Sequence, residues 1–256
     1  MNQGISNAVG IIPARLESTR LPRKLLLAKT GRPLIQHTWE AALEASSLSR
    51  LIVATDSPEI ADAVEKFGGE SVLTGDHPSG TDRIAEVIRR FGAEDEIVVN
   101  IQGDEPEINP DNIDRLVHSL AIAPNTEMAT LATPILEDKT LNDPACTKVV
   151  CAADGRALYF SRSPIPFCRD GNVSELLSSN SPWLLHIGVY GYRREFLLRL
   201  TELPQSKLEA VEKLEQLRAL EAGAKIQVEI VSHHAPGIDT PQDYTAFVAR
   251  YNETRS

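Results

Sequence analysis

The chain has 256 residues, of which 42% are hydrophobic and 24% are charged, as is typical of a soluble globular protein. Its 26 basic and 36 acidic side chains give a net charge of −10, which disfavours a general nucleic-acid-binding protein. No apolar run approaches the roughly 18 residues of a membrane span, the first ten residues lack a secretory signal, and the three cysteines fit neither a disulfide framework nor a zinc site. These features predict a cytoplasmic enzyme that acts on neither nucleic acid nor membrane.

Strand-like and helix-like segments alternate in the first half of the chain. Strands are predicted at residues 9–12, 50–55, 71–73 and 96–101, and helices at residues 33–45, from 57 onward and at 81–91. The last of these strands is apolar on both faces, which is typical of a parallel strand covered by helices on both sides. The alternation predicts an α/β sheet with right-handed crossovers.

The middle third of the chain has a different pattern. Strands are predicted at residues 128–135, 148–152, 157–160 and 184–192, with Asp154-Gly155 as a hairpin turn. A helix follows over residues 206–222, opened by a capping box of Ser206 and Glu209, then a strand at 225–232 and a helix at 240–251. We therefore expect one domain over residues 1–256, with a mixed, mostly parallel sheet and a β-rich excursion over about residues 128–205.

The loop after the first strand is rich in basic residues. It contains Arg15, Arg20 and Lys24, and ligands of open α/β sheets bind at the carboxyl ends of strands. Arginine offers a planar fork of donors and lysine a compact charge, so this loop is suited to a polyphosphate. Neither a Walker A nor a G-x-G-x-x-G motif is present, so side chains must do most of the binding. The alternative interpretation is a solvated basic face.

Carboxylates follow two other predicted strands. Asp104 comes after the buried strand in the segment Gln102-Gly-Asp, and Asp239 lies between the last strand and the last helix. Magnesium prefers hard oxygen ligands and takes one or two carboxylates, with substrate phosphates completing its shell. The alternatives are a simple turn at Asp104 and a structural role at the helix start for Asp239.

Two further pairs are candidate contacts to a polar ligand. His186 and Tyr190 are an even number of residues apart, so in an extended strand their side chains share a face. The alternative for this histidine is a satisfied polar group of the strand. Glu215 and Gln216 lie on the predicted helix 206–222, where a solvated outer face is the alternative.

Taken together, eight stretches resemble the 3-deoxy-manno-octulosonate (KDO) cytidylyltransferase family. In order from Val9 to about Tyr244 they are IIPARLESTRLPRKLL, IVATD, HPSGTDRIAEV, VVNIQGDEP, ALYFSRSPIP, HIGVYGYR, LEQLRAL and GIDTPQDY. The resemblance implies a three-layer α/β/α nucleotide-diphospho-sugar transferase fold and a homodimer formed through the β-rich excursion. It also implies transfer of CMP from CTP to the acidic eight-carbon sugar KDO, with release of pyrophosphate, for lipopolysaccharide synthesis.

The resemblance also assigns roles to individual residues. Arg15, Arg20 and Lys24 would hold the triphosphate, and Asp104 and Asp239 would bind Mg²⁺; of these, Arg15, Lys24 and the two aspartates would carry catalysis. Ser79 and Gly80 would lie near the cytosine, and Gln102 beside the sugar and nucleotide. The sugar pocket would be lined by Arg162, His186, Tyr190, Glu215 and Gln216. Positioning and charge neutralisation would do most of the catalytic work, and no general base is evident.

The chain departs from the family pattern at three places. Arg23 stands where the family usually has glycine, which adds charge near the expected triphosphate site. The loop at residues 73–77 is one residue shorter than usual, which affects the expected cytosine contacts, and residues 143–148 also differ.

Alternative functions are cytidylyl transfer to 8-amino-KDO or to a sialic acid, or a non-catalytic CTP-binding module. Sialate enzymes usually have Gly-Gly-Ser-Lys in the first loop, where this chain has Leu-Glu-Ser-Thr-Arg.

Overall fold

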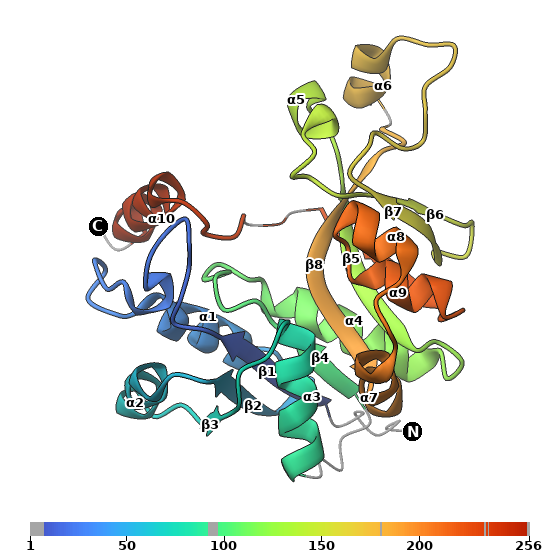
Figure 1. Ribbon diagram of the computed structural model, residues 1–256. Helices are drawn as coiled ribbons and strands as arrows, with labels where there is room; N and C mark the ends of the chain where they lie inside the picture. The colour runs from blue at the N-terminus through green and yellow to red at the C-terminus, as the bar shows by residue number, and fades with distance from the viewer. Residues whose placement is uncertain (1–7, 92–96, 180, 233, 235, 255–256) are drawn as a thin grey trace, which may run out of the picture. The chain divides into compact units, whose positions relative to one another are not determined.

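The computed structural model describes residues 8–91, 97–179, 181–232, 234 and 236–254 (Figure 1). The chain divides into two compact units, the first formed by Met1–Val117 and Ala235–Ser256 and the second by His118–His234. The expected single domain over residues 1–256 stays a prediction. Among the described residues, no helix has both the length and the apolar character that a membrane crossing requires.

The first unit is built on a parallel sheet. Its strands are β1 (Ala8–Ala14), β2 (Leu48–Thr55), β3 (Ser71–Leu73) and β4 (Ile97–Asn100), in the order β3-β2-β1-β4. All four residues of β4 are buried, as its apolar run predicted. The four strand predictions are confirmed within the described residues, and Glu96 lies outside them.

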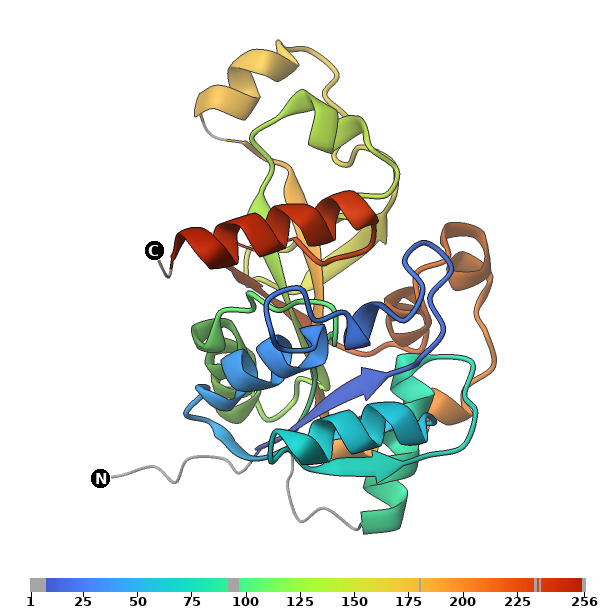
Figure 2. The ribbon, with the colours of Figure 1, turned by 90° about the vertical axis from the view of Figure 1, so that its left-hand side faces the viewer.

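Three helices connect these strands. α1 (Leu34–Leu43) joins β1 to β2, α2 (Pro58–Lys66) joins β2 to β3, and α3 (Gly80–Phe91) returns the chain to β4 on the other side of β1. Right-handed crossovers place α1 and α2 on one face of the sheet and α3 on the other, as Figures 1 and 2 show. The direction of winding reverses between β1 and β4, so the carboxyl ends of these two strands form the topological switch point of the sheet.

Capping residues set the ends of two helices in this unit. Ser57 accepts a hydrogen bond from the Ile60 N–H at the start of α2, where Pro58 occupies the first turn. Thr240 and Asp243 form a capping box at the start of α10 (Pro241–Glu253). α10 packs against α1, because the His37 ring lies 5.1 Å from Phe247 and 4.8 Å from Tyr251. This packing fixes the chain just before α10, where Asp239 lies.

The second unit contains antiparallel strands. β5 (Met128–Pro134) pairs antiparallel with β8 (Leu184–Arg193) and parallel with β9 (Ile226–Ile230). β6 (Lys148–Cys151) pairs antiparallel with β7 (Ala157–Ser161) and with β8. Between β6 and β7 lies the predicted turn, where Gly155 has φ of +82°. The chain therefore has the predicted mixed α/β fold with a mostly parallel central sheet, and β-strands gather in the predicted middle part.

The helices of the second unit include one element that the sequence did not predict correctly. α4 (Pro110–Ile122) leads into the unit, followed by α5 (Asp138–Asn142), α6 (Val173–Ser179), α7 (Arg194–Glu202), α8 (Lys207–Glu212) and α9 (Gln216–Glu221). The single helix expected over residues 206–222 is wrong, because Lys213 adopts φ of +56° and ends α8. Arg218 donates to the Glu209 carboxylate (2.5 Å) and so holds α9 back against α8. The predicted capping box at Ser206 is confirmed.

Candidate active site

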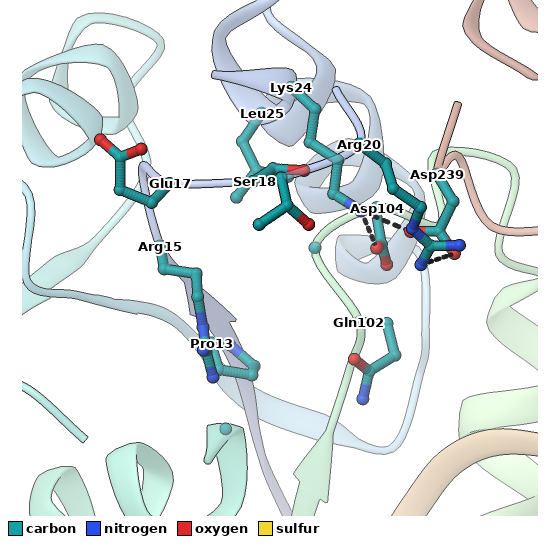
Figure 3. A pocket seen from close by; sticks show the side chains of 13 residues that line it. Pro13, Arg15, Glu17, Ser18, Arg20, Lys24, Leu25, Gln102, Asp104 and Asp239 are labelled. Atoms are coloured by element: carbon teal, nitrogen blue, oxygen red, sulfur yellow. Dashed lines mark hydrogen bonds and ion pairs between the residues drawn. The ribbon is translucent and has the colours of Figure 1, made fainter. Parts of the chain in front are cut away.

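A cavity of about 460 Å³ lies at the switch point of the first unit (Figure 3). Its lining comes from the end of β1 and the segment after it, the segment after β4, the first residue of α3 and the segment before α10. The lining residues are Pro13, Arg15, Glu17, Ser18, Thr19, Arg20, Lys24, Leu25, Gly80, Gln102, Gly103, Asp104 and Asp239. Ligands of open α/β sheets bind at this place. Seven of the predicted site residues therefore line one cavity: Arg15, Arg20, Lys24, Gly80, Gln102, Asp104 and Asp239.

The basic loop, residues 15–24, supplies three cations to this cavity. Arg15 and Arg20 are exposed, whereas Lys24 is mostly buried. Figure 3 shows Lys24 and Arg20 directed toward the two aspartates, with Arg15 beside Pro13 on another side of the cavity. The gathering of these side chains argues against a merely solvated basic face, and their role toward a triphosphate stays a prediction.

Lys24 joins the two candidate metal carboxylates. Its Nζ donates to Asp104 Oδ2, to Asp239 Oδ1 at 3.0 Å and to the Ile238 carbonyl at 3.0 Å. Burial favours the neutral amine, but the charges and hydrogen bonds of Asp104 and Asp239 outweigh it, so the pKa of Lys24 is raised. Arg20 Nη2 lies 2.9 Å from the other oxygen of Asp239. Lys24 and Arg20 therefore hold the carboxylates of Asp104 and Asp239 close together in the cavity.

Backbone contacts explain why the two aspartates come together. The Ile238 N–H donates to the Asp104 carbonyl at 2.8 Å, which sets Asp239 beside Asp104. Thr38 of α1 donates to the Gly103 carbonyl at 2.9 Å and fixes the chain after β4. A Cβ at Gly103 would lie 3.3 Å from both Ile12 and Ile35, a spacing that leaves little room for any other residue. The turn that the sequence offered as an alternative is thus a turn that carries a carboxylate into the cavity.

The donor set fits a magnesium ion. Among the described residues there is no group of three or more His, Cys, Asp or Glu side chains placed to hold a metal. Magnesium needs only one or two carboxylates when phosphates complete its shell. Asp104 and Asp239 offer two carboxylates close together, since the ammonium of Lys24 contacts both.

The neighbouring Glu105 is only 8% exposed, and its burial together with the charge of Asp104 raises its pKa to about 8.

Ser79 and Gly80, predicted near the cytosine, have different environments. The Ser79 hydroxyl donates to Asp82 Oδ2 at 2.8 Å and accepts from the Asp82 N–H at 3.1 Å, so it caps α3. Gly80 lines the cavity, and a Cβ there would lie 3.2 Å from Pro13 Cγ. Gln102 lines the cavity as well, and its Nε2 donates to Asn100 Oδ1 at 3.4 Å.

Arg23, which stands where the KDO cytidylyltransferase pattern usually has glycine, does not line the cavity. It adopts φ of +56° and pairs with Glu59 of α2. With Pro22, Leu26 and Glu59 it lines a separate hollow. The expectation that Arg23 adds charge near the triphosphate is therefore wrong, because its charge is directed to α2 and is neutralised there.

In the second unit, His186 and Tyr190 lie on one face of β8, as their spacing predicted. Their ring centroids are 5.4 Å apart, although a bulge opposite Thr130 shifts the register between them. His186 Nε2 lies 3.0 Å from Thr130 Oγ1, and the ring packs edge-on against Phe160 at 4.9 Å. Burial, reinforced by His234, lowers the pKa of His186 to about 3, so the imidazole is neutral near pH 7.

Glu215 and Gln216 lie at the break between α8 and α9 and not on the outer face of one long helix. Gln216 is only 5% exposed, and its Nε2 finds no hydrogen-bond partner among the described residues. Burial and the nearby charge of Glu215 raise the pKa of Tyr190. The buried amide of Gln216 is thus adjacent in sequence to the carboxylate whose charge acts on Tyr190.

Arg162 is held by the same break. Its Nε donates to the Glu212 carbonyl at 2.7 Å and its Nη1 to the Pro144 carbonyl at 2.8 Å, while Glu212 Oε2 accepts from its backbone N–H at 3.0 Å. It thus fixes the segment that precedes Glu215, and its role toward a sugar stays a prediction.

Sequence reasoning missed two residues that support these groups: Thr38 and Thr130. Each is an ordinary residue of an expected strand or helix. Only the folded packing shows which side chain or carbonyl it faces, so the sequence contained no signal for them.

Comparisons with known proteins give the family of the chain. A family model described as cytidylyltransferase matches residues 9–226. A 3-deoxy-manno-octulosonate cytidylyltransferase from Rhodopirellula baltica is 49% identical over 243 residues, which cover 94% of this chain and 96% of that protein. The chain belongs to the 3-deoxy-manno-octulosonate cytidylyltransferase family. The resemblance inferred from the eight motifs is thereby confirmed.

One further relative and one solved structure are informative about the substrates of similar proteins. An 8-amino-3,8-dideoxy-manno-octulosonate cytidylyltransferase from Shewanella halifaxensis is 45% identical, and the match covers 95% of this chain and 98% of that protein. The structure of a CMP-2-keto-3-deoxy-manno-octonic acid synthetase complexed with CTP superposes with a TM-score of 0.90 at 41% identity, covering 97% of this chain and all of that one. Members of this family thus differ in the sugar that their names give.

Proposed function

We propose that this protein transfers CMP from CTP to the anomeric hydroxyl of KDO, giving CMP-KDO and pyrophosphate for lipopolysaccharide synthesis in the cytoplasm. One observation carries the proposal. At the switch point of the sheet, a single cavity contains two aspartates bridged by Lys24, together with Arg15 and Arg20. That arrangement suits a nucleoside triphosphate with its metal, and the named relatives act on KDO or its amino variant.

The chain's own contribution to the nucleotide step is positioning and charge. The anomeric oxygen attacks the α-phosphorus, the bond from that phosphorus to the bridging oxygen of the β-phosphate breaks, the hydroxyl proton is released and pyrophosphate leaves. Arg15 and Arg20 offer forked donors to phosphate oxygens, and Lys24 offers an ammonium that the two carboxylates keep charged. Fixed charges of this kind stabilise the transition state at little reorganisation cost.

We propose that Asp104 and Asp239 hold Mg²⁺ together with the phosphates. When bound, the ion neutralises phosphate charge and lowers the pKa of a coordinated hydroxyl. Lys24 contacts the same two carboxylates, so its ammonium is already placed among the groups that surround the phosphates.

We assign sugar recognition to the second unit. Neutral His186 can donate or accept a hydrogen bond, and the unpaired Nε2 of Gln216 is a buried donor that a hydroxyl or carboxylate would satisfy. Tyr190 and Glu215 add a hydroxyl and a carboxylate beside them. Arg162 belongs to the same proposed set through its contacts at the α8–α9 break.

The second candidate substrate is 8-amino-KDO, because relatives of nearly equal identity bear that name. A single pocket contact changes preference by only about 1–3 kcal/mol, so the two sugars must be compared directly. We propose to measure pyrophosphate release from CTP and Mg²⁺ with KDO, 8-amino-KDO and a sialic acid in parallel. Release that is fastest with KDO supports the proposal, fastest release with another sugar replaces the substrate, and no release with any of them overturns the activity.

We also propose a homodimer formed through the β-rich excursion. Leu136, Leu158 and Phe167 of this part are 69%, 59% and 85% exposed in the single chain. Large exposed apolar side chains gathered in one part of a chain favour association.

A further inference from the structure

One face of α3 carries a row of charged side chains that the proposed chemistry does not use. Arg83, Glu86 and Arg90 are spaced by three and four residues, so they project from one side of the helix. We call them the α3 row. Each of them binds the chain between the end of β3 and the start of α3 (Figure 1).

Arg83 is the most buried member of the row, with a side chain only 1% exposed. Its Nη1 donates to Thr74 Oγ1 at 2.5 Å and to the Gly75 carbonyl at 3.4 Å. Its Nη2 donates to Asp56 Oδ2 at 2.5 Å, just after β2. One guanidinium therefore ties the loop to the carboxyl end of the neighbouring strand.

Glu86 holds the next part of the loop. Its Oε2 accepts from the Gly75 N–H at 2.9 Å and lies 2.5 Å from His77 Nε2, while its Oε1 accepts from Arg90 at 2.9 Å. Arg90 in turn donates to the Leu73 carbonyl at 2.6 Å. Burial disfavours the carboxylate, but the hydrogen bonds from His77, Gly75 and Arg90 outweigh it and hold the pKa of Glu86 at about 2.

These contacts fix the loop through side chains that do not belong to the cavity lining. The loop leads through the helix cap at Ser79 into Gly80, which lines the cavity against Pro13. Figure 3 shows Pro13 apart from the cluster of Lys24, Asp104 and Asp239. With the phosphates at that cluster, the base would lie toward Pro13 and Gly80, at the end of the loop that the α3 row holds.

We propose that the α3 row presets residues 74–79 for the nucleobase, and that Glu86 is a positioning residue for nucleotide affinity and base selectivity. A loop already held in its binding conformation loses less conformational entropy when the ligand binds. The row thereby gives the loop a fixed shape. This inference rests on the proposed function, because it assumes that the cavity binds CTP.

Two variants of Glu86 test the inference. Glu86→Ala removes the acceptor for Gly75, His77 and Arg90, and alanine keeps the helix. Glu86→Gln keeps one acceptor and the shape. The matched control is Glu70→Gln, which breaks the exposed ion pair with Arg50 near the other end of β3. Dissociation constants for CTP and UTP are measured by calorimetry with Mg²⁺, alongside thermal unfolding and steady-state kinetics.

We expect Glu86→Ala to weaken CTP binding about tenfold and to narrow the preference for CTP over UTP, with kcat at saturating CTP within about twofold of wild type. Glu86→Gln should recover part of the affinity, and Glu70→Gln should bind as wild type does. Wild-type affinity and selectivity in Glu86→Ala would overturn the inference, as would a lower kcat with unchanged CTP affinity. A wild-type protein that does not bind CTP would overturn the proposed function, and this inference with it.

Discussion

At the scale of single residues, the central feature is the ammonium of Lys24 between two carboxylates. Asp104 and Asp239 come from segments 135 positions apart (239 − 104), and one nitrogen contacts both. If these carboxylates only closed a salt bridge, neutral amides of the same shape would cost stability and leave turnover intact. If they bind a metal ion that the phosphates also ligate, amides must abolish turnover, because they cannot supply the same charge.

We expect Asp104→Asn and Asp239→Asn each to lower the rate of pyrophosphate release by at least about 100-fold. Asp62→Asn is the control, since Asp62 is exposed on α2 outside the cavity lining. The rates are measured at saturating CTP and sugar over a range of Mg²⁺ concentrations. Full turnover in either variant would show that the metal assignment is wrong.

His186 gives a second prediction at this scale. Burial and His234 lower its pKa to about 3, well below the ordinary value of 6.5, so the ring binds a proton only in strong acid. We expect the imidazole of His186 to stay neutral from pH 5 to 8 in NMR spectra of histidine-labelled protein, with His186→Asn identifying the signal. Titration of that signal near pH 6.5 would contradict the neutral histidine that we assign to sugar recognition.

Several of these residues could be predicted from the sequence, and the reason is physical. Arg15, Lys24 and Asp104 follow strands of a parallel sheet, and the carboxyl ends of such strands share one edge. The capping role of Ser79 was not predicted, because it requires α3 to begin at Gly80, whereas the predicted helix began one residue later. Thr130 carried no signal, since its importance comes from the groups that it faces.

At the scale of elements, the strands were predicted from the sequence more fully than the segments that join the helices. The alternation predicted the strands β1 to β4 but not their order in the sheet. The break between α8 and α9 was not predicted, because the apolar stripe runs through it. The left-handed Lys213 and the Glu209–Arg218 pair make the break, and both are tertiary features. The break places Glu215 and Gln216 at a helix start, where a continuous helix would have placed them on its outer face.

The left-handed backbone conformation of Arg23 is expected to lower the stability of the folded protein. Its φ of +56° suits glycine, and the ion pair with Glu59 is half exposed on both sides. We expect Arg23→Gly to have a free energy of unfolding about 1 kcal/mol above that of Arg23→Ala, which loses the same ion pair without relieving the backbone. Urea denaturation measures both. Equal stability of the two variants would show that the backbone conformation costs nothing there.

The α3 row also predicts a dependence of stability on pH. The pKa of Glu86 is about 2 in the folded protein, below its ordinary value of 4.5. The unfolded carboxylate therefore takes up its proton at a higher pH than the folded one, and the contribution of Glu86 is complete above about pH 4.5 and is lost as the pH falls toward 2.

We accordingly expect Glu86→Gln to lower the free energy of unfolding by about 1–2 kcal/mol at pH 7. The difference from wild type should shrink as the pH falls below 4.5, in denaturation curves recorded between pH 3 and 7. A difference that is constant over this range would mean that the hydrogen bonds of Glu86 do not depend on its charge.

At the scale of the whole molecule, the two units divide the proposed task. The first unit contains the cavity with the basic loop and the two aspartates, and the second contains the residues assigned to the sugar. The alternation of strands and helices in the sequence predicted the mixed α/β class. It could not predict the association state, which depends on surfaces and not on periodicity.

The homodimer proposal is tested at this scale. We expect Leu158→Glu with Phe167→Glu to convert a dimer to a monomer in light scattering, because each of these exposed apolar residues would lose about 1.5–3 kcal/mol of burial at an interface. Val211→Glu is the control, since Val211 is 82% exposed on α8, outside residues 128–205. A wild-type protein that is already monomeric would overturn the proposal.

The proposed reaction is attack on the α-phosphorus of CTP by the anomeric hydroxyl of KDO. The most direct test is to incubate the protein with CTP labelled at the α-phosphate, Mg²⁺ and KDO, and to identify the labelled product by chromatography and mass. We predict that the label appears in CMP-KDO, with one unlabelled pyrophosphate released for each molecule formed. Label in a diphosphate-linked sugar, or CTP that remains intact with KDO present, would contradict the account.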